Sequence, residues 1–262
     1  MLSIQKYHFA ASLEEAYAVL QENRSNAILG GCTFLRLGSK KINTAVDISR
    51  LGLDTVAETE DWLEIGAMYS LRQLETNPVI CNSFSAIKKA LESIVGIQFR
   101  NVATVGATVY SKYGFSDLNT ALLAYETEVL LYKNGRMTLK DYITKKPLRD
   151  ILYKIILPKK GIIAAYQDVR NSAGDYPILN TAVSKDGQKF IIVSGARPGG
   201  ACIAQKASRY LAECGLSQGE IARAAEIAAD ELDFGTNMRG SAEYRKKVCA
   251  VLVKRCIEEV LL

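Results

Sequence analysis

Two glycine-containing segments, about seventy residues apart, carry residue types that could hold a doubly charged phosphate group. The first segment is Leu29-Gly30-Gly31-Cys32-Thr33, and the second is Arg100-Asn101-Val102-Ala103-Thr104-Val105-Gly106-Ala107. Glycine lets the main chain come close to a ligand, and successive backbone N–H groups in such turns attract anions. A diphosphate held between the two segments would make a dinucleotide site built from two loops.

Either segment alone is a weak signal, because paired glycines after a strand usually form only a tight turn. The segments Ile65–Glu75, between them, and Ser116-Asp117-Leu118, after them, strengthen the interpretation. In their order, spacing and flanks these segments resemble the FAD-binding subunit of the molybdenum hydroxylases. This is the family of the xanthine dehydrogenase, carbon monoxide dehydrogenase and nicotinate dehydrogenase flavoproteins. The resemblance runs from Phe9 to Arg239–Arg245, which is nearly the whole chain.

The resemblance implies which residues contact FAD. Those of the first loop, whose backbone N–H groups would wrap the diphosphate, are Ile28, Leu29, Gly30, Gly31, Cys32, Thr33 and Leu35. Those of the later segments are Ala103, Thr104, Gly106, Ala107, Thr108, Ser111, Ser116 and Asp117. Thr104 and Ser116 are implied to bond phosphate or ribityl oxygens. Cys32 is expected to fill space rather than to react.

Asp117 is expected to accept from ribityl or ribose hydroxyls, because a carboxylate beside a diphosphate would be repelled. Its alternative role is a plain helix N-cap at the start of Leu118-Asn119-Thr120, and both roles can coexist.

Three positions depart from the family pattern. Ala107 replaces a glycine, Thr108 replaces an asparagine, and Gln167 replaces a lysine often found near the flavin. An alanine costs on the order of 1 kcal/mol where φ is positive or where phosphate crowds the Cβ, so we expect Ala107 to weaken FAD binding. Gln167 removes a positive charge that favours reduced, anionic flavin. Because Arg170 and Asp175-Tyr176-Pro177 match the family, we expect the second domain to cover the flavin.

The amino-acid composition indicates a globular protein and argues against several other classes. With 262 residues, 48% of them hydrophobic, and a net charge of +5 spread along the sequence, the chain is typical of a globular protein and not of one that binds nucleic acid. We find no signal segment and no run of eighteen apolar residues, so we expect a cytoplasmic protein without membrane insertion.

The histidine and cysteine content indicates which metal sites and covalent flavin links this chain could form. The only histidine is His8, and the six cysteines include no Cys-x-x-Cys pair, so neither a zinc nor an iron–sulfur site is indicated in this chain. Covalent flavin attachment generally needs a histidine or cysteine at the ring, and His8 is expected in an ordinary N-terminal strand. The FAD is therefore expected to be noncovalent. No Gly-x-Gly-x-x-Gly follows the first strand, which argues against a Rossmann fold.

Apolar periodicity and turn signals predict an α+β fold. The expected helices begin at Ser12 and Ser70 and span 85–95 and 116–124, and the expected strands are 27–29, 45–48, 62–65 and 151–157, with a hairpin across Asn134-Gly135. Antiparallel strands at 162–169, 178–183 and 190–194 follow, and then helices from Ala201, Ser217 and Ser241.

The resemblance identifies these elements as two domains. Residues 1–160 would form a two-lobed FAD-binding domain of the PCMH/vanillyl-alcohol-oxidase type, with lobes of about 1–55 and 56–160. Residues 161–262 would form a smaller α+β domain.

The function implied is an FAD-binding electron-transfer subunit of a multi-subunit molybdenum hydroxylase. A partner chain would hold the molybdenum cofactor, a 2Fe-2S subunit would deliver electrons, and FAD would pass them to an acceptor such as NAD. One alternative is a structural or assembly subunit that has lost tight FAD binding, and another is a free-standing flavin reductase. The substrate, the acceptor and the subunit stoichiometry do not follow from the sequence.

Overall fold

The computed structural model describes all residues, 1–262, and they divide into two compact units whose segments alternate along the chain. The first unit contains Met1–Leu74, Ile97–Ser111 and Glu128–Leu157. The second contains Glu75–Gly96, Lys112–Thr127 and Pro158–Leu262. No helix is both long enough and apolar enough to cross a membrane.

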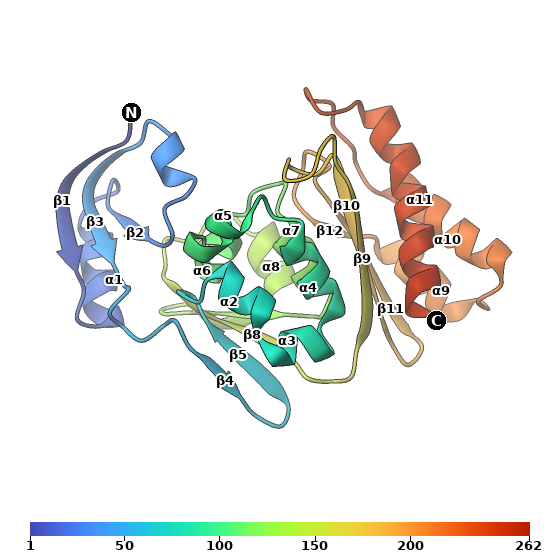
Figure 1. Cartoon of the computed structure of the whole chain (residues 1–262), viewed down its shortest axis with the longest axis horizontal. Coiled ribbons are helices and arrows are strands. Elements are labelled where there is room, and N and C mark those ends of the chain that lie inside the picture. Colours follow the sequence, from blue (N-terminus) through green and yellow to red (C-terminus); the bar gives the residue numbers. More distant parts are fainter. The chain divides into compact units, whose positions relative to one another are not determined.

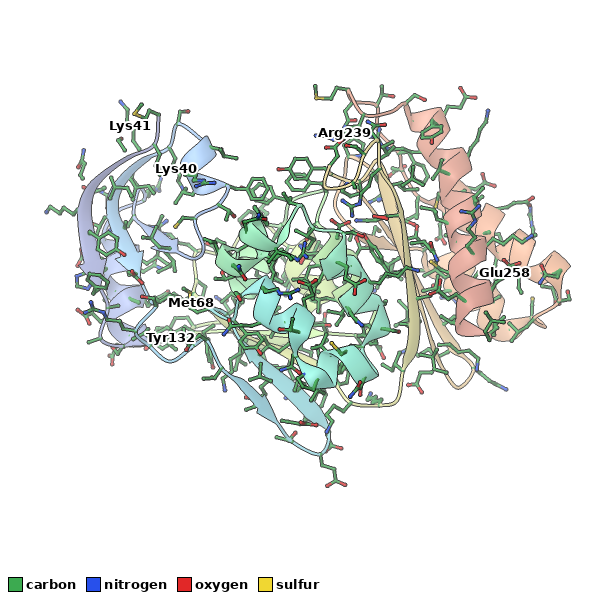
Figure 2. All side chains as sticks on the ribbon, in the orientation of Figure 1. Lys40, Lys41, Met68, Tyr132, Arg239 and Glu258 are labelled. Carbon is green, nitrogen blue, oxygen red and sulfur yellow. The ribbon has the colours of Figure 1, made fainter.

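The first sheet of the first unit is parallel and positions the first glycine segment (Figure 1). Its order is β1 (Ser3–Phe9), β3 (Lys41–Asp47) and β2 (Ala27–Leu29). Helix α1 (Leu13–Glu22) packs against β3 and is capped by Ser12, as the sequence predicts. Because β2 and β3 are parallel, their carboxyl ends lie at one edge of the sheet, and the glycine segment leaves β2 there. Lys40 and Lys41 lie at the opposite, amino end of β3 (Figure 2).

The second sheet of the first unit has five strands in the order β4 (Val56–Glu58), β5 (Trp62–Gly66), β8 (Leu152–Pro158), β6 (Glu128–Leu131) and β7 (Gly135–Thr138). The other elements of this unit are η1 (Leu35–Leu37), α5 (Ile97–Val102), α6 (Val105–Tyr110), α8 (Leu139–Thr144) and the start of α2 (Leu71–Thr76). Met68 and Tyr132 pack against the core around Val46 and Ile48 (Figure 2). The predicted capping box at the start of α2 is confirmed, because Ser70 and Gln73 bond each other's backbone N–H.

The second unit is built on an antiparallel sheet in the order β12 (Cys202–Ile203), β11 (Lys189–Gly195), β10 (Leu179–Asp186) and β9 (Ile163–Val169). Helices α9 (Gln205–Glu213), α10 (Gln218–Glu231) and α11 (Ala242–Val260) bury an apolar core against it. Helices α4 (Ser85–Glu92) and α7 (Asp117–Ala124) contact the same strands, so the sheet lies between two helical layers (Figure 1). Helix α3 (Pro78–Ser83) precedes α4. The predicted antiparallel strands and the helices from Ser217 and Ser241 are confirmed. The helix expected from Ala201 begins instead at Gln205, because Cys202 and Ile203 pair with β11 as β12.

The hairpin between β6 and β7 differs from the prediction. Leu131 pairs with Gly135, so the connection has three residues and not the two of an Asn-Gly turn. The buried carboxylate of Asp150 accepts from the backbone N–H groups of Lys133 and Asn134 and from the Asn134 side chain. Asp150, which supplies this acceptor, is distant in sequence from the turn. The local Asn-Gly signal therefore did not reveal that the turn has three residues.

Arg245, in α11, is the largest fully buried side chain and is only 1% exposed. Its guanidinium donates to the carbonyl oxygens of Ile178, Gly235 and Gly240 and to Asn237 Oδ1, at 2.5 to 2.8 Å. All four acceptors are neutral. Arg245 therefore fastens the start of β10 and the loop before α11 to the helix.

Replacing Arg245 with methionine should destabilise the protein by about 3 kcal/mol, because buried carbonyl oxygens lose their donors. Thermal and urea unfolding would measure the loss. The matched control is Arg223→Met, at a side chain that is 59% exposed and pairs with Glu226, and it should change stability by no more than about 0.5 kcal/mol. Equal effects of the two variants would contradict a fastening role for Arg245.

Candidate functional site

The two glycine segments lie against each other in the first unit. A Cβ added at Gly31 would fall 1.9 Å from the carbonyl oxygen of Val102. A Cβ added at Gly30 would fall 2.6 Å from the Ala107 Cβ and 3.0 Å from Thr104 Oγ1. The absence of side chains at Gly30 and Gly31 is therefore required by contact between the two segments. The expectation that a ligand alone demands these glycines was incomplete.

The first segment carries free backbone donors. The N–H groups of Gly30, Gly31, Cys32 and Thr33 donate to no acceptor in the protein. Cys32 has a φ of 56°, in the left-handed region, which costs about 1–2 kcal/mol for a residue with a Cβ. A left-handed residue in a short loop turns successive N–H groups toward one side, which is the geometry of an anion-binding nest. This four-residue run, Gly30–Thr33, is called the N–H run below.

The Cys32 thiol is not activated. Its Sγ donates to the carbonyl oxygen of Gly30 at 3.1 Å. Burial raises the pKa of Cys32, and the nearby carboxylate of Asp47 raises it further. The thiol therefore stays protonated near neutral pH, as expected for a residue that fills space.

The second segment is different, because its backbone donors are already used. It folds into α5 and α6, and the N–H groups of Val105 and Gly106 donate to the carbonyl oxygens of Tyr69 and Ala67 at 2.9 Å. Thr104 caps α6 by accepting from the Ala107 N–H. The second segment therefore serves as a scaffold that holds α6 against the N–H run.

The hydroxyl groups that follow in α6 are also bonded within the helix. Thr108 Oγ1 donates to the carbonyl oxygen of Thr104 at 2.8 Å, and Ser111 Oγ donates to that of Ala107 at 2.7 Å. Ala103 is buried directly before the cap. The FAD contacts of these three residues remain predictions.

Ala107 is not strained. It lies inside α6 and is not among the residues with positive φ, so the expectation of strain from a positive φ was wrong. Crowding of its Cβ by a phosphate stays a prediction. The strained residue of the pair of loops is Cys32, in the other segment. A helix interior accepts alanine better than any other residue, which explains why this departure from the family costs the fold nothing.

The remaining predicted contacts of the first unit flank the N–H run. Ile28 and Leu29 form the end of β2 and pair with Val46 and Asp47 of β3. Leu35 begins η1 immediately after the run. The sheet therefore holds one end of the run and a helical turn holds the other.

Ser116 and Asp117 belong to the second unit, at the start of α7. Ser116 is the N-cap, because its hydroxyl accepts from the Asn119 N–H. Asp117 is 6% exposed, and its Oδ1 accepts from Tyr166, Arg170 and Asn180 at 2.5, 2.7 and 3.0 Å. Burial raises the pKa of Asp117, while the Arg170 guanidinium acts in the opposite direction.

Ser116 and not Asp117 caps α7, so the alternative role of Asp117 as the N-cap was wrong. The three protein donors give Asp117 a structural role that sequence reasoning did not foresee. The prediction that it also bonds a ribityl or ribose hydroxyl stays open. Gln167 lies in β9, and its amide donates to Glu259 of α11 at 2.6 Å.

Comparisons with known proteins find two family matches that follow each other along the chain. The family described as "FAD binding domain in molybdopterin dehydrogenase" matches residues 2–160. A second, "CO dehydrogenase flavoprotein C-terminal domain", matches residues 164–260. The resemblance seen in the sequence is therefore confirmed.

Individual relatives match over nearly their full length. The chain is 27% identical to the 6-hydroxypseudooxynicotine dehydrogenase complex subunit alpha of Paenarthrobacter nicotinovorans, over 97% of this chain and 94% of that protein. It is 25% identical to the carbon monoxide dehydrogenase medium chain of Hydrogenophaga pseudoflava, over 96% and 95%.

Solved structures confirm the predicted α+β two-domain fold. A carbon monoxide dehydrogenase chain from H. pseudoflava matches with a TM-score of 0.89 and 22% identity, over 100% of this chain and 98% of that one. A chain of quinoline 2-oxidoreductase from Pseudomonas putida 86 matches with a TM-score of 0.86 and 20% identity, over 97% and 96%.

Gly31→Ala should destabilise the flavin-free protein by about 3 kcal/mol, because the new methyl group collides with the Val102 carbonyl and forces the segments apart. Circular dichroism on FAD-stripped protein would record the fall in melting temperature. The control is Gly38→Ala, where a Cβ meets only Leu35 O, at 3.5 Å. Unchanged stability of FAD-stripped Gly31→Ala would show that the contact between segments is not what requires glycine.

Ala107→Gly should lower stability by about 1 kcal/mol and should not tighten FAD binding, because a helical alanine has no strain to relieve. Chemical unfolding and titration of the apoprotein with FAD would measure the two effects. Ala222→Gly in α10 supplies the ordinary cost of glycine in a helix. Tighter FAD binding by Ala107→Gly would restore the original view of a weakened site.

Proposed function

The chain belongs to the FAD-binding family of molybdopterin dehydrogenases and is an FAD-binding oxidoreductase subunit, and on that premise we propose that it transfers electrons within a molybdenum hydroxylase complex. Electrons would arrive from a 2Fe-2S subunit and leave through FAD to an acceptor such as NAD. The molybdenum cofactor that acts on the substrate would be held by another partner chain.

The observation that carries this proposal is the N–H run. Four successive N–H groups without an acceptor in the protein suit the two negative charges of a diphosphate. The run lies at the carboxyl ends of parallel strands, where nucleotides bind in many α/β sheets. The residues present therefore fit the FAD that the family implies.

This chain's own residues would hold and orient the cofactor. The N–H run would bind the diphosphate, Thr104 Oγ1 lies beside Gly30 as an additional hydroxyl donor, and α6 would keep the run in place. Bound flavin joins one-electron and two-electron carriers, so the protein needs no acid–base pair of its own.

The names of the relatives support the proposed partners. One relative is called a dehydrogenase complex subunit, and others are called medium subunits or chains of nicotine 6-hydroxylase and carbon monoxide dehydrogenase. We therefore propose that this chain forms a complex with a molybdopterin-binding subunit and a 2Fe-2S subunit. A cytoplasmic location is part of the same proposal.

The alternative of an assembly subunit without tight FAD binding has lost part of its support. It was motivated by the departures from the family at Ala107, Thr108 and Gln167. In the structure Ala107 has no positive φ, and Thr108 makes a hydrogen bond within its helix. Gln167 remains as the one departure that favours it. Gln167 bears on the electronics of a flavin and not on the binding of its diphosphate.

The purified protein should be yellow and carry one noncovalent FAD, which denaturation releases. The absorption spectrum and a fluorescence titration of apoprotein with FAD would measure this. Bound flavin should then be bleached by NADH under anaerobic conditions if NAD is the acceptor. A colourless protein that fails to take up FAD would support the assembly role, whereas a yellow protein inert to NADH would leave the cofactor in place and refute only the acceptor.

A further inference from the structure

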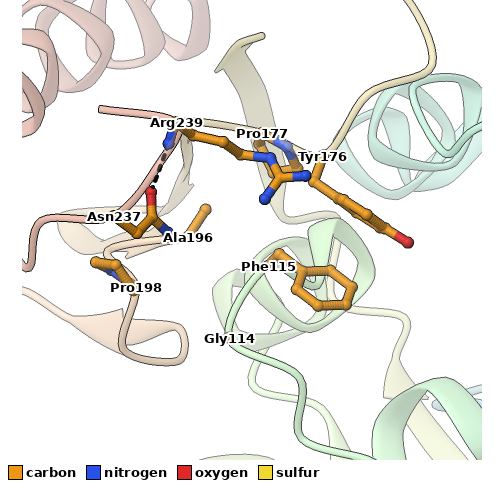
Figure 3. Close-up of a pocket in the computed structure, with 8 residues that line it drawn as sticks. All are labelled: Gly114, Phe115, Tyr176, Pro177, Ala196, Pro198, Asn237 and Arg239. Atoms are coloured by element: carbon orange, nitrogen blue, oxygen red, sulfur yellow. Dashed lines mark hydrogen bonds between the residues drawn. The ribbon is translucent and has the colours of Figure 1, made fainter. Parts of the chain in front are cut away.

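The small cavity of the second unit is not a separate site. Its walls include Phe115, directly before the predicted contacts Ser116 and Asp117, and Tyr176 and Pro177, of the segment expected to cover the flavin (Figure 3). The flavin site gives no role, however, to an exposed strand of the first unit, β1.

Strand β1 is an edge strand with nothing paired to its outer side. The three-stranded sheet has the order β1-β3-β2, so β1 pairs only with β3 (Figure 1). Six of its seven residues are exposed. Natural proteins usually shorten, cover or interrupt such an edge, because its free backbone groups can pair with another strand. β1 contains no proline and keeps a constant register with β3, so the edge is not interrupted.

The outer side of β1 offers backbone donors and acceptors. The Ser3 N–H donates to the Lys40 carbonyl oxygen at 3.1 Å, where β1 begins to pair with β3. Backbone groups turn to alternate sides along a strand, so the Gln5 N–H also faces β3, whereas the N–H and C=O groups of Ile4 and Lys6 face outward. An extended segment laid beside β1 would pair with these outward groups.

Exposed apolar side chains accompany the free backbone groups. Ile4 is 42% exposed, Tyr7 52% and Phe9 47%. The rings of Tyr7 and Phe9 meet edge to face, with centroids 4.8 Å apart. The Tyr7 hydroxyl donates to the Asp47 carboxylate, and the Arg50 guanidinium lies 4.0 Å from the centroid of the Phe9 ring. The two rings are therefore held in place, and a partner would not have to order them.

The strand also carries one uncompensated charge. Lys6 is exposed in the middle of β1, forms no ion pair in the protein, and has no carboxylate beside it in the strand sequence. The carboxylates that contact the strand are already used, because Asp47 accepts from the Tyr7 hydroxyl and Glu15 accepts from the Ala11 N–H at 2.7 Å. An acidic residue of a partner would compensate the charge of Lys6.

A second copy of this chain is a poor match for the edge. In a two-fold antiparallel pair of β1 strands with full overlap, Ile4 would lie opposite His8, and Lys6 would lie opposite the Lys6 of the other copy. Like charges directly opposite each other destabilise a strand pair. Lys6 therefore disfavours self-association and favours a different chain that carries an acidic residue.

We propose that β1 is a docking edge to which a different protein chain adds an extended segment, with an acidic residue opposite Lys6. Apolar residues of that segment would contact Ile4 on one face of the sheet and the Tyr7–Phe9 pair on the other. Backbone hydrogen bonds would supply affinity, and these side chains would supply specificity. The inference rests on the proposed function, because the partner is taken to be a subunit of the proposed complex.

Hydrogen exchange, resolved to single residues by fragmentation mass spectrometry, would test the docking edge. It compares the purified chain with the chain in its complex with the molybdopterin-binding and 2Fe-2S subunits. The N–H groups of Ile4 and Lys6 should exchange at least about tenfold more slowly in the complex, because they gain acceptors there. The Gln5 N–H, which faces β3, is the internal control and should exchange equally slowly in both states.

The outcomes separate this inference from the function on which it rests. A complex that forms while Ile4 and Lys6 exchange as in the free chain would overturn the docking edge and leave the proposed function standing. Slow exchange of both groups in the free chain, together with a dimer mass in sedimentation, would assign the edge to a second copy and overturn the proposal as well. Failure of any complex to form would refute both.

Two variants at one position separate backbone pairing from charge. Lys6→Pro removes an outward N–H, and proline is tolerated on an edge strand where the N–H faces solvent. Lys6→Glu reverses the charge and keeps the N–H. Each should weaken assembly with the partner subunits about tenfold, and the effect of Lys6→Glu should shrink at high salt.

The control for the charge reversal is Lys160→Glu, at an exposed residue after β8, and it should assemble as the parent does. Melting temperature and FAD content would confirm that each variant is folded. If Lys6→Pro does not fold, Lys6→Glu alone decides. Assembly of the folded Lys6 variants with parental affinity would contradict the docking edge.

Discussion

The close contact between Gly31 and the Val102 carbonyl is the constraint on which the candidate site depends. No side chain fits there, since even a Cβ would come within 1.9 Å of that oxygen. The contact brings a loop after a parallel strand against the end of helix α5. It therefore fixes where the N–H run points before any ligand is bound, and preorganised donors bind an anion without an ordering cost.

The second unit uses a different means of holding its loops. Arg245 and Arg197 bond carbonyl oxygens, and Arg170 joins Asp117 to the loop at Asp175. An arginine has five donors in a rigid plane, so one side chain can fix several main-chain oxygens at once. Loops without regular backbone pairing are thereby held by side-chain donors.

The sequence predicts those features that depend on local signals. The Ser12 and Ser70 caps, the strand Ala27–Leu29 and the antiparallel β10–β11 pair all follow from residue types within a few positions of one another. The length of the turn at Asn134 was predicted wrongly because the carboxylate that accepts from its N–H belongs to Asp150, sixteen residues away. The three donors of Asp117 lie 49 to 63 residues further along the chain, and no local pattern announces them.

The first segment carries the free N–H donors and the second supports it, and this difference explains which positions can vary in sequence. In the second segment the N–H groups of Val105 and Gly106 already donate to acceptors inside the protein. The residue at position 107 therefore needs only to fit into a helix and to be small enough to pack against Gly30. Alanine does both. In the first segment a Cβ at Gly30 would collide with the start of α6, and a Cβ at Gly31 would collide with Val102 at the end of α5. Either collision would displace the free donors. Departure from the family at Ala107 is therefore compatible with a retained FAD site, whereas departure at either glycine would not be.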